Sequence, residues 1–276
     1  MAGREGIKLA FSTLGCPGWS LGQTVEAARR YGFEGVELRG IAGELDVRRL
    51  PDFSGEGIAR SRALFEDAGI DIVSLDSSAR LWQREADELR ENMAEAEDYI
   101  ELAGRIGAPL VRVFGGYIPE GVPLERAVRR LAGNLAALGD RARERGVAVA
   151  IETHDDFLTG KVLSEVMRAT DHESVGVVWD VSNCFWTGEP IQETVALLAP
   201  YLRHVHIKDS VLDGREARLT FIGDGDVPIH DVLTVLSELG YKGYLSYEWE
   251  KVWQPDLPEP EEAFPQYVER MREYLG

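Results

Sequence analysis

Four hydrophobic runs in the second half of the chain each end on a side chain that can bind a metal ion. In chain order these side chains are Glu152, Asp180, His206 and Glu248. Each run resembles a buried strand, so its final carboxylate or imidazole would lie at the rim of an apolar core, where an unpaired charge is costly. Four such endings in successive strands predict that the groups share a partner, and a divalent metal ion is the simplest one.

The donor types narrow the choice of ion. Carboxylate oxygens with one imidazole suit Mn²⁺, our first choice, and also Mg²⁺, Co²⁺, Fe²⁺ or Zn²⁺. The absence of thiolates from the set argues against a structural zinc site. For any one of these residues alone, a hydrogen-bonded or salt-bridged strand end explains the pattern equally well. All four in order favour a functional site, because perturbed charges gather at such sites.

Strand and helix patterns alternate along the whole chain. Short hydrophobic runs predict strands at residues 7–12, 35–38, 71–75, 110–114, 147–152, 175–180, 204–208 and 244–248. Apolar residues at helical spacing predict helices at 23–31, 57–68, 89–103, 124–142, 162–169, 193–198 and 229–239, with a closing helix at 267–274. Strands separated by helices imply crossover connections and a parallel sheet.

This repeat predicts an α/β fold, a (β/α)8 TIM barrel, with residues 1–276 as one domain and a C-terminal closing helix. A doubly wound open sheet is the alternative, but it usually carries a glycine-rich loop after the first strand. Here Gly15 and Gly18 follow that strand without forming a GxGxxG motif. In a barrel the carboxyl ends of the strands converge, so the four donors would surround one point.

The overall charge and cysteine usage exclude several function classes. The formal net charge of −18 opposes nonspecific binding to nucleic acid and to anionic membranes. Two cysteines, Cys16 and Cys184, form neither a disulfide framework nor a CxxC motif. No secretory signal opens the chain and no apolar run is long enough to span a bilayer. We expect a cytoplasmic enzyme or binding protein. Oligomeric state is not readable from the pattern, although barrels of this kind commonly pair, so a homodimer is one candidate.

Five segments, at 11–16, 32–38, 204–209, 222–226 and 240–248, resemble the xylose isomerase-like TIM-barrel superfamily, the sugar phosphate isomerase/epimerase group. The resemblance implies that Glu152, Asp180, His206 and Glu248 are the metal ligands, and that Glu152 and Glu248 are also the acid/base pair. It further implies a divalent-metal-dependent isomerase or epimerase of a sugar or related polyhydroxy ketone. Such an enzyme moves a proton through a metal-stabilised enediolate.

Two neighbouring residues point to a second reaction. His154 lies two positions after Glu152 and Lys208 two after His206, so each shares a strand face with a ligand. We expect His154 to act as a catalytic base and Lys208 to bind substrate. Together the two pairs resemble the dehydratase members, which act on inososes and on dehydroshikimate. A metal-dependent lyase of a β-hydroxy ketone is therefore the alternative function.

Three further residues are candidates for binding substrate: Asn183, Glu37 and Arg112. Asn183 stands where many epimerases carry histidine; its amide can bind a hydroxyl but cannot transfer a proton at neutral pH. An ion pair of Glu37 with Arg39 or Arg112 at the barrel rim is the alternative interpretation for that carboxylate. His154 could likewise simply contact a helix.

Other function classes fit less well. An apurinic endonuclease of the same superfamily uses many more histidines than the five in this chain, and its substrate is strongly anionic. A sugar-binding protein without catalysis would not need the intact ligand set. The segment 223–226 is acidic and no P-loop is present, so an unphosphorylated sugar, inosose or keto acid is at least as good a substrate as a phosphate ester.

Overall fold

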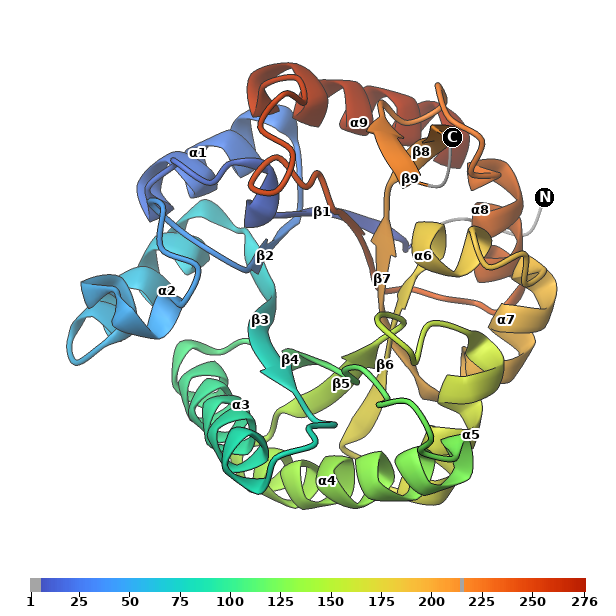
Figure 1. Cartoon of the computed structure of the whole chain (residues 1–276). Helices are drawn as coiled ribbons and strands as arrows, with labels where there is room; N and C mark the ends of the chain where they lie inside the picture. The colour runs from blue at the N-terminus through green and yellow to red at the C-terminus, as the bar shows by residue number, and fades with distance from the viewer. Residues whose placement is uncertain (1–5, 214–215) are drawn as a thin grey trace. The chain divides into compact units, whose positions relative to one another are not determined.

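The computed structural model describes residues 6–213 and 216–276. Eight of the described strands form a closed parallel barrel in the order β1-β10-β7-β6-β5-β4-β3-β2, which confirms the predicted (β/α)8 barrel and excludes the open sheet. Figure 1 lets the reader follow the elements along the chain. The chain divides into two compact units, Met1–Val73 with Val205–Gly276 (unit 1) and Ser74–His204 (unit 2), which are described one at a time.

In unit 1 the central strand is β1, which pairs in parallel with β2 on one side and β10 on the other. Strand β10 also pairs with the end of β7, and this register sets Ser246 opposite His206. The elements of unit 1 are β1 (Lys8–Ser12), η1 (Thr13–Gly15), α1 (Leu21–Tyr31), β2 (Gly35–Leu38), η2 (Val47–Arg49), η3 (Pro51–Phe53), α2 (Gly57–Ala68), α8 (Ile229–Glu238), β10 (Tyr244–Tyr247) and α9 (Pro260–Leu275).

Aromatic side chains fasten α9 to the strands of unit 1. The rings of Tyr247 and Tyr267 stack with centroids 4.5 Å apart, and Phe264 lies 4.4 Å from Phe11. All four residues are fully buried. Burial of large aromatic side chains contributes strongly to core stability, so α9 is part of the unit 1 core.

Unit 2 consists of three fully contained strands with helices alongside. Strands β4 and β5 pair in parallel, as do β5 and β6, and the register sets Arg112 opposite Ala150. The elements are α3 (Ala86–Ile106), β4 (Leu110–Phe114), α4 (Leu124–Arg145), β5 (Ala148–Glu152), α5 (Gly160–Thr170), β6 (Val175–Asp180), α6 (Val181–Phe185), α7 (Ile191–Leu198) and η4 (Ala199–Tyr201). Strands β3 (Asp71–Arg80) and β7 (Leu202–Ile207) run across the division between the units.

Several boundaries differ from the predicted ones. Strand β3 continues to Arg80 rather than ending at residue 75, so Asp76 lies inside the strand. Helix α9 begins at Pro260 rather than at residue 267, because proline at the first helical position has no N–H to leave unpaired. Strands β7 and β10 end one residue early, so Lys208 and Glu248 lie just beyond them.

Two further features were not predicted. Strands β8 (Asp209–Asp213) and β9 (Glu216–Thr220) form an antiparallel hairpin directly after β7, and the short helix α6 follows β6 at once. Cys16 and Cys184 are free and buried. Over the described part of the chain, no helix combines the length and apolarity needed to cross a membrane.

Candidate metal centre and its surroundings

A buried group in unit 1, here called the His206 cluster, consists of Glu37, His206, Lys208, Glu248 and Glu250. Glu37 belongs to β2, His206 to β7, and the other three follow strand ends. The backbone N–H of Glu248 donates to the Ile207 carbonyl at 3.1 Å, which continues the β10–β7 pairing one step beyond the strand. Sheet register therefore positions the Glu248 carboxylate next to His206.

His206 is fully buried between two carboxylates. Its Nε2 lies 2.8 Å from Glu37 Oε2, and its Nδ1 lies 3.5 Å from Glu248 Oε1. A carboxylate on one ring nitrogen fixes the orientation of an imidazole and raises its basicity as a metal ligand. The sequence pattern had suggested an arginine partner or a substrate for Glu37; the structure gives it His206 as a partner.

Lys208 is almost fully buried and bound by two carboxylates. Its Nζ donates to Glu248 Oε2 at 2.5 Å and also to Glu250. Burial alone would raise the pKa of Glu248, but the ammonium of Lys208 and the nearby His206 lower this pKa to about 2. Glu248 is therefore an anion at neutral pH, as a metal ligand must be.

Asp209, the next residue, anchors the loop after β9. Its carboxylate accepts backbone N–H bonds from Ser210, Gly223, Gly225 and Val227, at 2.8 to 3.1 Å. Residue 225 must be glycine, because a Cβ there would lie 2.1 Å from Asp209 Oδ1. The HxHxKD and GxGD segments of the sequence are thus two halves of one structural contact, which holds the chain directly after Lys208.

In unit 2 a second buried group, here called the Glu152 cluster, consists of Asp76, Arg112 and Glu152. Arg112 is 1% exposed. Its Nη2 donates to Asp76 Oδ2 at 3.2 Å, and its Nε lies 3.2 Å from Glu152 Oε2. Arg112 was expected to bind substrate, but these contacts are with carboxylates of the protein itself, so it orients Glu152 and neutralises part of its charge.

Asp180 ends β6 and at the same time caps α6. Its Oδ1 accepts the backbone N–H of Asn183 at 2.8 Å, as expected for an aspartate at a helix N-cap. The Asn183 amide donates to the Thr153 carbonyl at 3.3 Å. Thr153 Oγ1 in turn accepts the Asp180 N–H at 2.8 Å. The ends of β5 and β6 are therefore connected, which fixes the Asp180 carboxylate at the strand end.

His154 is half-exposed and lies directly beside a carboxylate. Its Nδ1 is 2.9 Å from Asp155 Oδ1, and Arg80 Nε donates to Asp155 Oδ2 at 3.2 Å. Burial would raise the pKa of Asp155, but the hydrogen bond and charge of His154, with Arg80, lower it. Asp155 adopts a left-handed backbone, with φ 52°. Such strain in a non-glycine residue is tolerated where the surroundings fix it, often at functional sites.

Each unit thus contributes acidic or histidine side chains that could hold a metal ion. Glu152 and Asp180 come from unit 2, and His206 and Glu248 from unit 1. Their oxygen and imidazole donors suit a hard or borderline divalent cation. Sequence reasoning missed Glu250 and Asp155, although each lies two or three positions after a predicted ligand and strand alternation points to Glu250.

Curated relatives match part of the chain at low identity. An uncharacterised protein of Methanocaldococcus jannaschii is 26% identical over 65% of this chain and 63% of its own length. An inosose dehydratase of Clostridium perfringens is 28% identical over 55% of this chain and 54% of its own length. The matched region therefore spans between about half and two thirds of these relatives.

Solved structures match over nearly the whole chain. The IolI protein with a bound zinc atom superposes with a TM-score of 0.81 at 17% identity, covering 98% of each chain. The probable 3-DHS dehydratase AsbF of Bacillus anthracis gives 0.80 at 15% identity, covering 96% of this chain and 99% of the other. An L-ribulose 3-epimerase gives 0.80 at 15% identity, covering 98% of this chain and 94% of the other. At these identities the likeness establishes the fold.

The family model described as xylose isomerase-like TIM barrel matches residues 25–274, almost the entire chain. The barrel topology agrees with it. The chain belongs to the xylose isomerase-like TIM barrel family.

Proposed function

We propose that this protein is a divalent-metal-dependent isomerase or epimerase of a sugar or related polyhydroxy ketone. The observation that carries the proposal is the pairing of buried His206 with Glu37 on one ring nitrogen and Glu248 on the other. A fully buried imidazole between two carboxylates has the arrangement of an oriented metal ligand. We propose that Glu152, Asp180, His206 and Glu248 bind one ion, with Mn²⁺ as the first choice.

The chemistry divides between the ion and the chain. A bound divalent ion would polarise a ketone and a neighbouring hydroxyl and so acidify the C–H between them. In the proposal, Glu152 and Glu248 take up and return the proton. Arg112 and Lys208, each in contact with one of these carboxylates, keep both ionised before substrate binds. Asn183 is proposed to bind a substrate hydroxyl.

A second candidate function, a lyase that removes water from a β-hydroxy ketone, is favoured by one observation. His154 has a carboxylate, Asp155, on its Nδ1, which is the arrangement that orients a histidine as a general base. Lys208 would then bind the ketone or leaving oxygen. The named dehydratases among the relatives and neighbours support this candidate, and the epimerase supports the first. A small-molecule substrate, a homodimer and a cytoplasmic location stay predictions.

Solvent-deuterium exchange tests the first candidate. Candidate ketoses and inososes are incubated with the Mn²⁺-loaded protein in D₂O, and deuterium at carbon is followed by NMR. Glu152→Gln and Glu248→Gln should each reduce exchange by about 100-fold or more. Glu120→Gln, at an exposed loop position, is the matched control and should be unaffected. Full exchange in both active-site variants would refute the acid/base assignment.

The lyase candidate makes a different prediction. Dehydration of an inosose or dehydroshikimate creates a conjugated product that absorbs in the ultraviolet, and His154→Ala should abolish its formation. Exchange without any such absorbance would leave the isomerase or epimerase as the function. Dehydration at an unchanged rate in His154→Ala would refute the role given to His154.

A further inference from the structure

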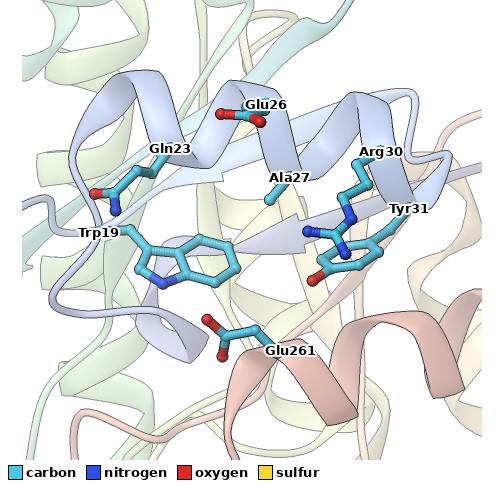
Figure 2. A pocket seen from close by; sticks show the side chains of 7 residues that line it. All are labelled: Trp19, Gln23, Glu26, Ala27, Arg30, Tyr31 and Glu261. Carbon is cyan, nitrogen blue, oxygen red and sulfur yellow. The ribbon is translucent and has the colours of Figure 1, made fainter.

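Two hollows on unit 1 lie outside the residues discussed so far. The smaller, shown in Figure 2, lies between α1 and the start of α9, with the Glu261 carboxylate facing the Trp19 ring; its volume is about 150 Å³. The larger has a volume of about 640 Å³. Pockets for small molecules occupy roughly 300–1,000 Å³, so only the larger of the two has room for a ligand beyond a few waters.

The larger hollow, here called the aromatic pocket, is formed by the end of β9 with its following loop and by the loop after β10. Its lining combines aromatic rings with polar groups. The residues are Arg218, Leu219, Thr220, Phe221, Asp224, Trp249, Trp253, Gln254, Pro255, Asp256, Leu257 and Pro258. All belong to unit 1, so the pocket is complete within that unit.

One wall of the aromatic pocket is held in place before any ligand binds. The Trp249 ring lies between those of Tyr247 and Phe221, and its Nε1 donates to the Pro258 carbonyl at 3.0 Å. Lys251 Nζ donates to the carbonyls of Pro255 and Leu257, at 3.0 and 2.7 Å. A preformed wall reduces the entropy lost on binding.

Two groups in the aromatic pocket are available to a ligand. The Trp253 side chain is 55% exposed, although a large aromatic ring is costly to leave in water. The Thr220 hydroxyl is buried and has no hydrogen-bond partner among the described residues, a state that costs free energy until a partner arrives. A ligand that covers the indole and reaches this hydroxyl would relieve both.

The charges of the lining select the class of ligand. Two carboxylates, Asp224 and Asp256, outnumber the single guanidinium of Arg218, which disfavours a phosphate or nucleotide. A purely apolar ligand would desolvate those carboxylates without a hydrogen bond in return. A neutral sugar ring satisfies both kinds of surface, because it carries hydroxyls at its edge and an apolar face that suits an indole.

The aromatic pocket is continuous with the His206 cluster through the chain. Trp249 directly follows Glu248, and the N–H groups of Trp253 and Gln254 both donate to the Glu250 carbonyl, at 2.9 and 3.0 Å. Glu250 in turn binds Lys208. We infer that the aromatic pocket binds a second sugar ring, so that the substrate is a glycoside or disaccharide bearing the ketone rather than a free monosaccharide. This inference rests on the proposed function for the identity of the reacting ring.

Binding of unreactive probes tests the aromatic pocket without turnover. Isothermal titration of cellobiose, maltose, p-nitrophenyl β-D-glucoside and glucose into the protein should show at least one two-ring probe binding more tightly than glucose. Trp253→Ala should weaken that binding by about tenfold, and Trp253→Phe should restore most of it. Leu212→Ala, an exposed residue of the neighbouring hairpin, should behave as wild type.

The outcomes separate the two claims. The inference is overturned if no two-ring probe binds more tightly than glucose, or if Trp253→Ala binds the probe as wild type does. If the deuterium-exchange experiment fails while the probe still binds through Trp253, the proposed function is wrong and the sugar-binding pocket stands.

Discussion

Replacing Lys208 by methionine tests the electrostatics of the His206 cluster. Methionine keeps most of the side-chain length and apolar volume but removes the ammonium that binds Glu248 and Glu250. Lys208 and Glu248 are both about 95% buried, so solvent screens their interaction little. The variant would leave a buried carboxylate without its cation, which is the costly way to break a buried ion pair.

The pKa of Glu248 sets the size of the effect. Its fall from 4.5 to about 2 corresponds to about 3 kcal/mol of stability at neutral pH. Because the folded pKa lies below the unfolded one, this stabilisation is fully present above about pH 4.5 and is lost as the pH falls toward 2. We therefore expect Lys208→Met to lower the free energy of unfolding by about 3 kcal/mol at pH 7, and by progressively less below pH 4.5.

Urea unfolding followed by circular dichroism at pH 7 and at pH 3.5 measures both quantities. EDTA in all samples removes any stabilisation by bound ions. Lys161→Met, at an exposed position of α5, is the matched control and should change stability by less than about 0.5 kcal/mol. A loss below about 1 kcal/mol at pH 7, or a loss that does not depend on pH, would refute the reasoning.

Two further predictions concern residues that hold others in place. Glu37→Gln should weaken Mn²⁺ binding by about 10- to 100-fold in a calorimetric titration, with the fold intact by circular dichroism, because the amide still contacts His206 but no longer carries a charge; unchanged affinity would contradict the orienting role of Glu37. Asp209→Asn should lower the free energy of unfolding by about 1–3 kcal/mol in urea, because an amide replaces one of the two oxygens that accept four backbone N–H groups; an unchanged unfolding midpoint would show that the loop at 222–227 does not depend on this anchor.

The barrel was predictable because its signals are local. Period-two and period-3.6 patterns repeat along the chain, and β2, β4, β6 and α2 have the predicted bounds. The hairpin of β8 and β9 was missed although the Asp-Gly pair at residues 213–214 is a known hairpin signal. The start of α9 was missed because prolines at 255, 258, 260 and 265 suggested an irregular segment; Pro260 instead begins the helix.

The candidate site was predictable in its residue types but not in its pairings. Strand ends identified Glu152, Asp180, His206 and Glu248, because burial makes charged residues conspicuous in an apolar run. Glu37 and His206 are 169 residues apart in the sequence and meet at 2.8 Å, and no local pattern encodes that contact. The same holds for Arg112 with Asp76. An isolated charge in a strand could contact substrate or another charge, and only the fold distinguishes the two.

The central claim is that one ion is bound by donors from both units. Electron paramagnetic resonance of Mn²⁺ titrated into the purified protein measures the number of bound ions and their affinity. The proposal predicts one ion per chain in the wild type, and a large loss of affinity both in Asp180→Asn and in His206→Gln. Two independent ions per chain, no bound ion, or full affinity in either variant would contradict it.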